Sequence, residues 1–262
     1  MAITFFRDGV LADSKRLIQM ARRAAMTSLV LLVTNVSWAS NWSIESPSEQ
    51  AYLLELFTSQ GCSSCPPADA WLSRLKQDPE LFNRVVPVAY HVTYWDYLGW
   101  KDAFGHAGHD VRHRSKAAAV GAGVYTPGVF LQGKEWRSWR RHTKGPQGST
   151  GSDVGVLRVM GRGNLVKVTF TPNHKGVYEH LRVYMTYLRS GQTNILSGEN
   201  RNRDLHYDFI AGEVHTEPLD WRNDEWSATY TFSAPVGAEA VAVWVEAGDN
   251  TYIQSTGGFL AQ

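Results

Sequence analysis

Apolar residues are spaced differently in the two halves of the chain. Between residues 50 and 141, short apolar runs alternate with a stretch of helical spacing. Strands and helices of these lengths, in alternation, predict an α/β layer with a partly parallel sheet. The expected elements are a strand at 52–57, a helix at about 67–77, a strand at 85–91, a helical or irregular stretch at about 98–121, and a strand at 129–132 that turns at Gly133.

From residue 153 onward, apolar and polar residues alternate with a period of two. Four such runs are separated by turns of glycine, proline and asparagine, and they predict strands at 165–170, 181–187, 226–232 and 240–245. No convincing helix lies between them, so we expect residues 153–262 to form a mainly antiparallel β-sandwich. The segment 142–152 is rich in glycine, serine and threonine, which is typical of a linker. We therefore predict an α/β domain at 50–141 and an all-β domain after the linker.

The N-terminal segment 1–39 has the layout of a secretory signal peptide. Arg22-Arg23 precede an apolar run at 24–33, and Ser37-Trp38-Ala39 offers small residues where a signal peptidase reads. We expect cleavage there, a polar leader at 40–49, and a periplasmic or secreted protein. The alternative is an uncleaved anchor, but the run is shorter than the ~20 residues of a spanning helix. We therefore expect contact with the membrane only transiently, during export.

The composition of the chain limits which classes of binding partner are expected. The chain has 26 Lys and Arg against 25 Asp and Glu, a formal net charge of +1. Nucleic-acid binding normally requires a basic stripe, which this sequence lacks, so we expect no nucleic-acid partner. Nothing in the sequence calls for a cofactor. Hydrophobic residues make up 43% of the chain, enough for a globular core.

The only two cysteines form the motif Cys62-Ser63-Ser64-Cys65, between the expected strand and helix. A helix N-terminus stabilises a nearby thiolate, so this order favours a thiol–disulfide redox site. A zinc site is less favoured, because no further cysteine exists and His106, His109 and His113 are the nearest other ligands. A purely structural disulfide stays open, although closing so short a loop removes little chain entropy.

Two other features support the redox interpretation. Glu55 is a charged residue inside the apolar strand, seven positions before Cys62. If buried, its carboxylate could take and return the proton of the resolving thiol; the alternatives are a solvated edge position or a structural ion pair. Thr126-Pro127 precedes a strand, where a cis bond would expose the Thr126 backbone to an extended substrate. A trans proline in an ordinary turn is the alternative.

A cluster of aromatic residues follows the strand at 85–91. It could wall a groove for an apolar peptide beside the cysteines, or it could be packing at a domain interface. Within it, we take Trp95 and His91 as candidate substrate-binding residues. The cluster consists of Tyr90, Tyr94, Trp95, Tyr97 and Trp100, together with His91 and Asp96.

These motifs together resemble the thioredoxin fold and, in particular, a secreted bacterial thioredoxin-like family, the domain of unknown function numbered 1223. The resemblance rests on the segments 57–69, 91–102 and 124–127, with further similarity at 197–200 and 240–246. It implies that Cys62 is the nucleophilic thiol, Cys65 the resolving thiol, Pro127 the cis-proline and Glu55 the buried acid. One departure is Pro66-Pro67, which removes two backbone N–H groups from the start of the helix.

We therefore expect an exported thiol–disulfide oxidoreductase acting on protein thiols or disulfides through a mixed disulfide. Its catalytic residues would be Cys62, Cys65 and Glu55, with Thr126, Pro127, Trp95 and His91 contacting the substrate and no metal involved. The alternative is a non-catalytic secreted binding or scaffold protein with a structural disulfide.

Overall fold

The computed structural model describes residues 41–148, 150–248 and 251–260. The expected signal peptide lies outside this part of the chain. The described residues form mainly β-sheet with few helices, in line with a β-sandwich. None of the described helices is long and apolar enough to cross a membrane.

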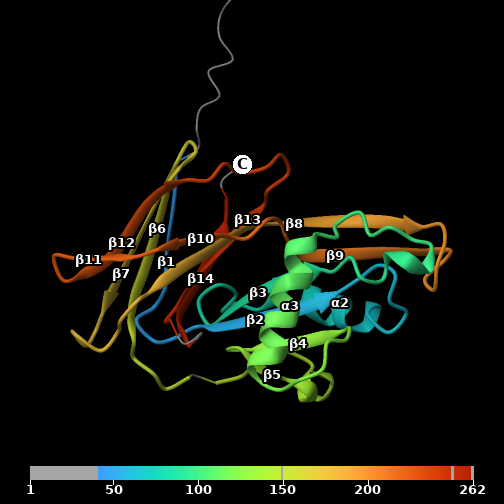
Figure 1. Ribbon diagram of the computed structural model, residues 1–262, viewed down its shortest axis with the longest axis horizontal. Coiled ribbons are helices and arrows are strands. Elements are labelled where there is room, and N and C mark those ends of the chain that lie inside the picture. The colour runs from blue at the N-terminus through green and yellow to red at the C-terminus, as the bar shows by residue number, and fades with distance from the viewer. Residues whose placement is uncertain (1–40, 149, 249–250, 261–262) are drawn as a thin grey trace, which may run out of the picture. The chain divides into compact units, whose positions relative to one another are not determined.

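The strands form two sheets (Figure 1). The first has nine strands in the order β14-β13-β8-β9-β3-β2-β4-β5, with β10 paired to β8; the second has five, in the order β1-β6-β7-β12-β11. The strands of the larger sheet are β2 (Tyr52–Thr58), β3 (Val85–His91), β4 (Gly128–Leu131), β5 (Lys134–Glu135), β8 (Arg182–Ile195), β9 (Arg203–Ala211), β10 (His215–Pro218), β13 (Ala240–Glu246) and β14 (Tyr252–Phe259). Those of the smaller sheet are β1 (Asn41–Glu45), β6 (Gly155–Arg162), β7 (Leu165–Pro172), β11 (Asp220–Arg222) and β12 (Glu225–Thr231).

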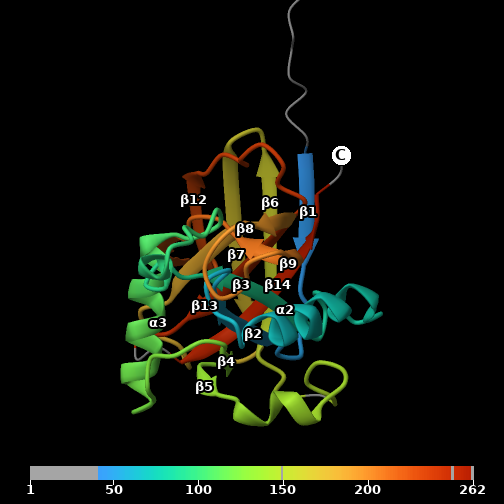
Figure 2. The same ribbon diagram turned by 90° about the vertical axis from the view of Figure 1, so that its right-hand side faces the viewer.

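Helices α2 (Pro66–Ser73) and α3 (Ala107–Ala119) cover opposite faces of the larger sheet near β2 and β3 (Figure 2). All seven residues of β3 are buried, as expected for a strand covered on both faces. Helix α2 starts with Pro66 and Pro67, which are tolerated there because the first N–H groups of a helix have no intrahelical acceptor. The expected helix at 67–77 is therefore a short α-helix continued by a 3₁₀ helix at Arg74–Gln77.

Strand β13 joins two hydrophobic cores. Val241, Val243 and Val245 pack with β6, β7 and β8 in the sandwich core, whereas Ala242 and Trp244 face the core beside the helices. Successive side chains of a strand point to opposite faces, so one strand serves both layers. The period-two pattern read at 240–245 is thus a strand buried on both sides.

Two expectations about organisation change. Residues 41–45, expected to be part of a polar leader, form β1, which pairs antiparallel with β6. The two expected domains also share the larger sheet, because β9 pairs in parallel with β3 through Ala89 and Ile210. The linker-like segment 142–152 thus separates parts of the chain that hydrogen-bond into one sheet.

Candidate functional site

Cys62 and Cys65 form a disulfide at the point where the loop after β2 enters α2. Cys65 is the N-cap residue of α2, and its carbonyl accepts hydrogen bonds from Ala68 N at 2.8 Å and Asp69 N at 3.1 Å. Both cysteines are almost fully enclosed, with exposures of 2% and 0%, while the two serines between them are exposed. The expected arrangement of strand, cysteine pair and helix is therefore present.

The turn between β8 and β9 holds the cysteine loop in place. Asn200, which is fully buried, donates from Nδ2 to the carbonyl oxygens of Gln60 and Cys62, both at 2.9 Å. Next to it, Glu199 accepts a hydrogen bond from Ser63 N at 3.1 Å, and hydrogen bonding from the Ser63 side chain and then from its backbone N–H lowers the pKa of the Glu199 carboxyl. Reasoning from the residues missed both roles; the only signal was the family resemblance at 197–200.

Three of the expected substrate-binding residues lie beside the cysteine pair. The Thr126–Pro127 peptide bond is cis, and the Thr126 carbonyl accepts a hydrogen bond from Ser64 Oγ at 3.4 Å. The Trp95 indole donates from Nε1 to Thr126 Oγ1 at 2.7 Å. Trp95 is half-buried and also contacts the backbone near Gly61, where an added Cβ would lie 3.2 Å from Trp95 Cβ. Trp95, Thr126 and the cysteine loop therefore lie in contact with one another.

His91 does not fit its expected contact with substrate. Its side chain is fully enclosed, and its Nδ1 lies 2.8 Å from Asp102 Oδ2. Asp102 also accepts hydrogen bonds from Gln60 N and Phe104 N, both at 2.8 Å. Burial opposes the charge of Asp102, but His91 and these bonds hold its pKa below the ordinary value. The pair supports the cysteine loop from inside.

Asp69 lies near this pair and was not singled out by the sequence. It is on α2, with 6% exposure, and Oδ2 has no hydrogen-bond partner among the described residues. Burial raises its pKa to about 7, although His91 and the Thr58 hydroxyl act in the opposite direction and Asp102 adds to the rise. The Thr58 hydroxyl is close enough to influence the carboxyl, yet the two do not meet hydrogen-bond geometry.

Glu55 is placed differently from a proton relay behind the thiols. Its Oε1 lies 2.6 Å from Arg112 Nη2, and its Oε2 accepts a hydrogen bond from Tyr252 at 2.7 Å. Arg112 belongs to α3, and the neighbouring His113 stacks on Phe57, so these odd-numbered positions of β2 face α3. Helix α2 covers the other face (Figure 2). The fully buried Glu55 thus belongs to a structural ion-pair network, which was one of the alternatives.

The aromatic cluster divides between packing and surface. Tyr90 is fully buried and stacks on Phe57 with ring centroids 5.1 Å apart, and Trp100 donates to Gln60 Oε1 at 2.9 Å. Tyr97, in contrast, is 77% exposed and stacks on Trp95. Tyr97 therefore lies at the surface next to Trp95, whereas the buried members hold the fold together.

The histidines weighed as zinc ligands have other contacts. Nδ1 of His109 lies 2.9 Å from the His91 carbonyl and Nε2 lies 3.0 Å from the Gly212 carbonyl, while Nδ1 of His113 lies 3.1 Å from the Tyr94 hydroxyl. Within the part of the chain that the structure describes, no group of three or more His, Cys, Asp or Glu side chains could hold a metal ion.

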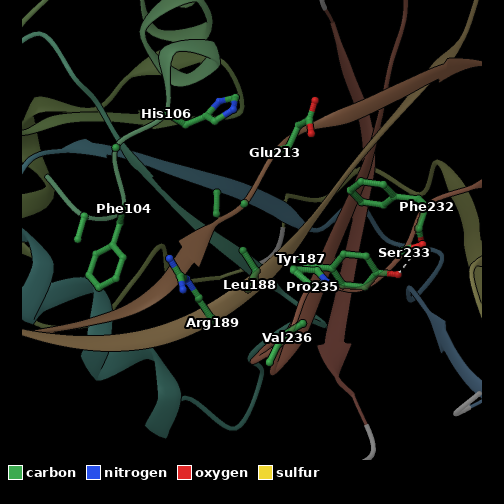
Figure 3. A pocket seen from close by; sticks show the side chains of 15 residues that line it. Phe104, His106, Tyr187, Leu188, Arg189, Glu213, Phe232, Ser233, Pro235 and Val236 are labelled. Carbon is green, nitrogen blue, oxygen red and sulfur yellow. Dashed lines mark hydrogen bonds between the residues drawn. The ribbon is translucent and has the colours of Figure 1, made fainter. Parts of the chain in front are cut away.

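A cavity of about 410 Å³ lies away from the cysteine loop, between the residues that precede α3 and strands β8 and β9 (Figure 3). Aromatic rings of Phe104, Tyr187 and Phe232 line it, and His106 and Arg189 are among its polar residues. No cysteine lines this cavity. This cavity and the cysteine pair are thus at different places.

The fold and the site define a mainly β protein that carries a disulfide-bonded cysteine pair at the start of a helix. The chain belongs to the family described as "Protein of unknown function (DUF1223)", which matches residues 53–246. The family expected from the sequence is thus confirmed.

Two solved structures are similar in fold. The X-ray structure of protein AGR_C_4864 from Agrobacterium tumefaciens has 23% sequence identity and a TM-score of 0.57, covering 81% of this chain and 95% of that one. HBP35 of Porphyromonas gingivalis has 13% identity and a TM-score of 0.56, covering 81% of this chain and 76% of that one. No curated protein matches the sequence.

Proposed function

We propose that this protein is an exported thiol–disulfide oxidoreductase with a thioredoxin-like arrangement around its cysteine pair. One observation carries the proposal: the Cys62–Cys65 disulfide lies at the start of α2, and Ser64 between the cysteines donates a hydrogen bond to the Thr126 carbonyl, directly before Pro127. A disulfide that serves only as a staple would not require a second backbone segment beside its exposed serines.

The strand arrangement supports the thioredoxin-like part of the proposal. Strands β2 and β3 are parallel and connected through α2, while β4 pairs antiparallel with β2, and β5 with β4. Strand β9 adds in parallel on the far side of β3. A departure is the region after β5, where the described residues contain a 3₁₀ helix at Arg137–Arg141 in place of the longer helix that usually follows the last hairpin of a thioredoxin-like fold.

In the proposed reaction, the Cys62 thiolate attacks a substrate disulfide, and Cys65 then resolves the mixed disulfide. The first thiolate has limited backbone support, because Pro66 and Pro67 lack N–H groups and Glu199 occupies the N–H of Ser63. The Ser64 hydroxyl, with Oγ 3.4 Å from Cys62 Sγ, can donate to the thiolate only by giving up its hydrogen bond to the Thr126 carbonyl. We therefore expect the Cys62 thiol pKa to fall below the ~8.5 of a free thiol, but only modestly.

Trapping of mixed disulfides in cells tests the proposal. The Cys65→Ala variant should accumulate disulfide-linked partners through Cys62, whereas Cys62→Ala should accumulate none. Alkylation of Cys62 in the reduced protein should also be faster than that of a free thiol at neutral pH. If Cys65→Ala traps no partner and Cys62 reacts no faster than a free thiol, the non-catalytic scaffold with a structural disulfide is the better interpretation.

The exported location is tested separately. The order of basic, apolar and small residues in 1–39 supports a signal peptide, and an oxidising compartment favours a stable disulfide. Mass spectrometry of the protein from the periplasm or medium should find a chain that begins near residue 40. An intact N-terminus on membrane-embedded protein would contradict export with cleavage.

A further inference from the structure

Asp69 shares a helix face with the expected resolving cysteine. It lies four residues after Cys65, and its backbone N–H donates to the Cys65 carbonyl at 3.1 Å. Side chains four residues apart lie on one face of a helix and lean toward its N-terminus, so we expect the Asp69 carboxyl to lie toward the turn that carries Cys65. Cys65 is completely enclosed. Its thiol therefore needs a proton acceptor inside the protein rather than in bulk water.

Polar atoms without hydrogen-bond partners gather around this carboxyl. Burying such atoms unpaired is costly and uncommon, so a group of them at one place indicates a role beyond packing. They come from four elements but lie close together. The rings of His91 and Tyr207 have centroids 4.9 Å apart. The charge of His91 lowers the pKa of Asp69, and the charge of Asp69 raises the pKa of Tyr207. Among the described residues, these unpartnered atoms are Asp69 Oδ2, Thr58 Oγ1, His91 Nε2 and the Tyr207 hydroxyl.

Building on the proposed redox function, we propose that Asp69 exchanges a proton with the Cys65 thiol during resolution of the mixed disulfide. The Asp69 carboxylate takes the proton, and the Cys65 thiolate forms the S–S bond with Cys62. The bond between Cys62 and the substrate sulfur breaks, and its electron pair leaves on the substrate thiolate. The cysteine pair is oxidised by two electrons and the substrate disulfide is reduced. In the reverse direction, protonated Asp69 returns the proton to the departing Cys65.

The other carboxyl groups are less suited to this exchange. Asp102 has both oxygens engaged in hydrogen bonds, and its pKa is lowered, so it stays charged. Glu55 lies on the face of β2 toward α3, paired with Arg112. Asp69 Oδ2 has no partner within hydrogen-bond geometry, and burial raises the pKa of the carboxyl to about 7, so near neutral pH it can both accept and donate a proton. His91 and Asp102 act as positioning residues that set its surroundings.

The test isolates the resolving step with glutathione as the substrate. Reduced protein is mixed with oxidised glutathione, and rapid quenching with mass spectrometry follows formation of the mixed disulfide and then release of glutathione between pH 5 and 9. In the wild type, the resolution rate should change slope near pH 7. In Asp69→Asn this inflection should disappear, and the rate near neutral pH should fall by about 10-fold or more. Asp208→Asn, which removes a different buried carboxylate paired with Lys76, is the matched control and should keep the inflection.

The two proposals fail in different ways. If Asp69→Asn forms the mixed disulfide and resolves it with the wild-type rate and pH profile, the role of Asp69 is wrong, while the redox function stands. If the wild type forms no mixed disulfide, both proposals are wrong. Should Asp69→Asn not fold, as judged by circular dichroism, infrared titration of the wild type replaces it. A protonated carboxyl band that titrates near pH 7 and shifts on oxidation would support the role, and the lack of any such band would overturn it.

Discussion

Replacing Arg112 with methionine should destabilise the protein strongly, because it leaves the carboxylate of Glu55 buried without a cation. In the structure, Arg112 lies 2.6 Å from Glu55 and 3.4 Å from Glu246. Lys116 still pairs with Glu246 at 3.2 Å, so only Glu55 loses its counter-charge. Removing one partner of a buried ion pair costs about 3–5 kcal/mol. For a domain of this size, that lowers the melting temperature by about 6–20 °C.

Chemical denaturation and calorimetry of two variants measure this effect. Arg112→Met alone should show the full loss, whereas Arg112→Met combined with Glu55→Gln removes both charges and should recover about half of it or more. The comparison matters for function, because it assigns Glu55 to the stability of the fold. A loss below about 1 kcal/mol in Arg112→Met, or a double variant no more stable than the single one, would refute the ion-pair argument.

Two further predictions concern the cysteine loop. Burial raises the pKa of Asp69 from 3.8 to about 7 in the folded state. Between these two values, the folded state still holds a proton that the unfolded state has lost. The contribution of Asp69 to the free energy of unfolding therefore falls as pH rises from about 4 to 7. Asp69→Asn should therefore gain stability relative to the wild type by up to about 4 kcal/mol between pH 4 and pH 8, measured by urea unfolding; an unchanged difference would contradict the raised pKa. Glu199→Gln removes a negative charge that accepts a loop N–H beside Cys62. Iodoacetamide should then alkylate Cys62 a few-fold faster at neutral pH, and an unchanged rate would show that Glu199 does not restrain the thiol.

The local pattern of apolar residues predicted those helices and strands that a short stretch of sequence is enough to define. The strands at 85–91 and 240–245 were found because their runs are apolar. Strand β14 was missed because it contains Gly257 and Gly258, which suggest a turn. In the structure Gly257 allows close approach, since an added Cβ would lie 2.4 Å from Phe82. Composition of a short window does not reveal such packing.

In the candidate site, too, residues in local motifs were predicted, whereas residues that depend on distant parts of the chain were not. The cysteine pair and Thr126–Pro127 were recognised from motifs, because their chemistry is local. The ion pair of Glu55 was only one of several alternatives, because its partner Arg112 follows it by 57 residues. Asp69 looked like an ordinary residue of a short helix, since what makes it unusual is enclosure by strands that include β9, far along the chain. Long-range enclosure, which the local sequence does not reveal, is what raises the pKa of the Asp69 carboxyl.

The hydrogen bonds from Asn200 to the cysteine loop form late during synthesis of the chain. These two hydrogen bonds join residues that are 140 and 138 positions apart. A chain grows from its N-terminus, so Cys62 and Cys65 are synthesised well before Asn200, which holds their loop. In the nascent chain the two thiols lack the buried amide of Asn200 and the carboxylate of Glu199. The cysteine pair therefore acquires its mature chemical surroundings only when the last third of the protein joins the sheet.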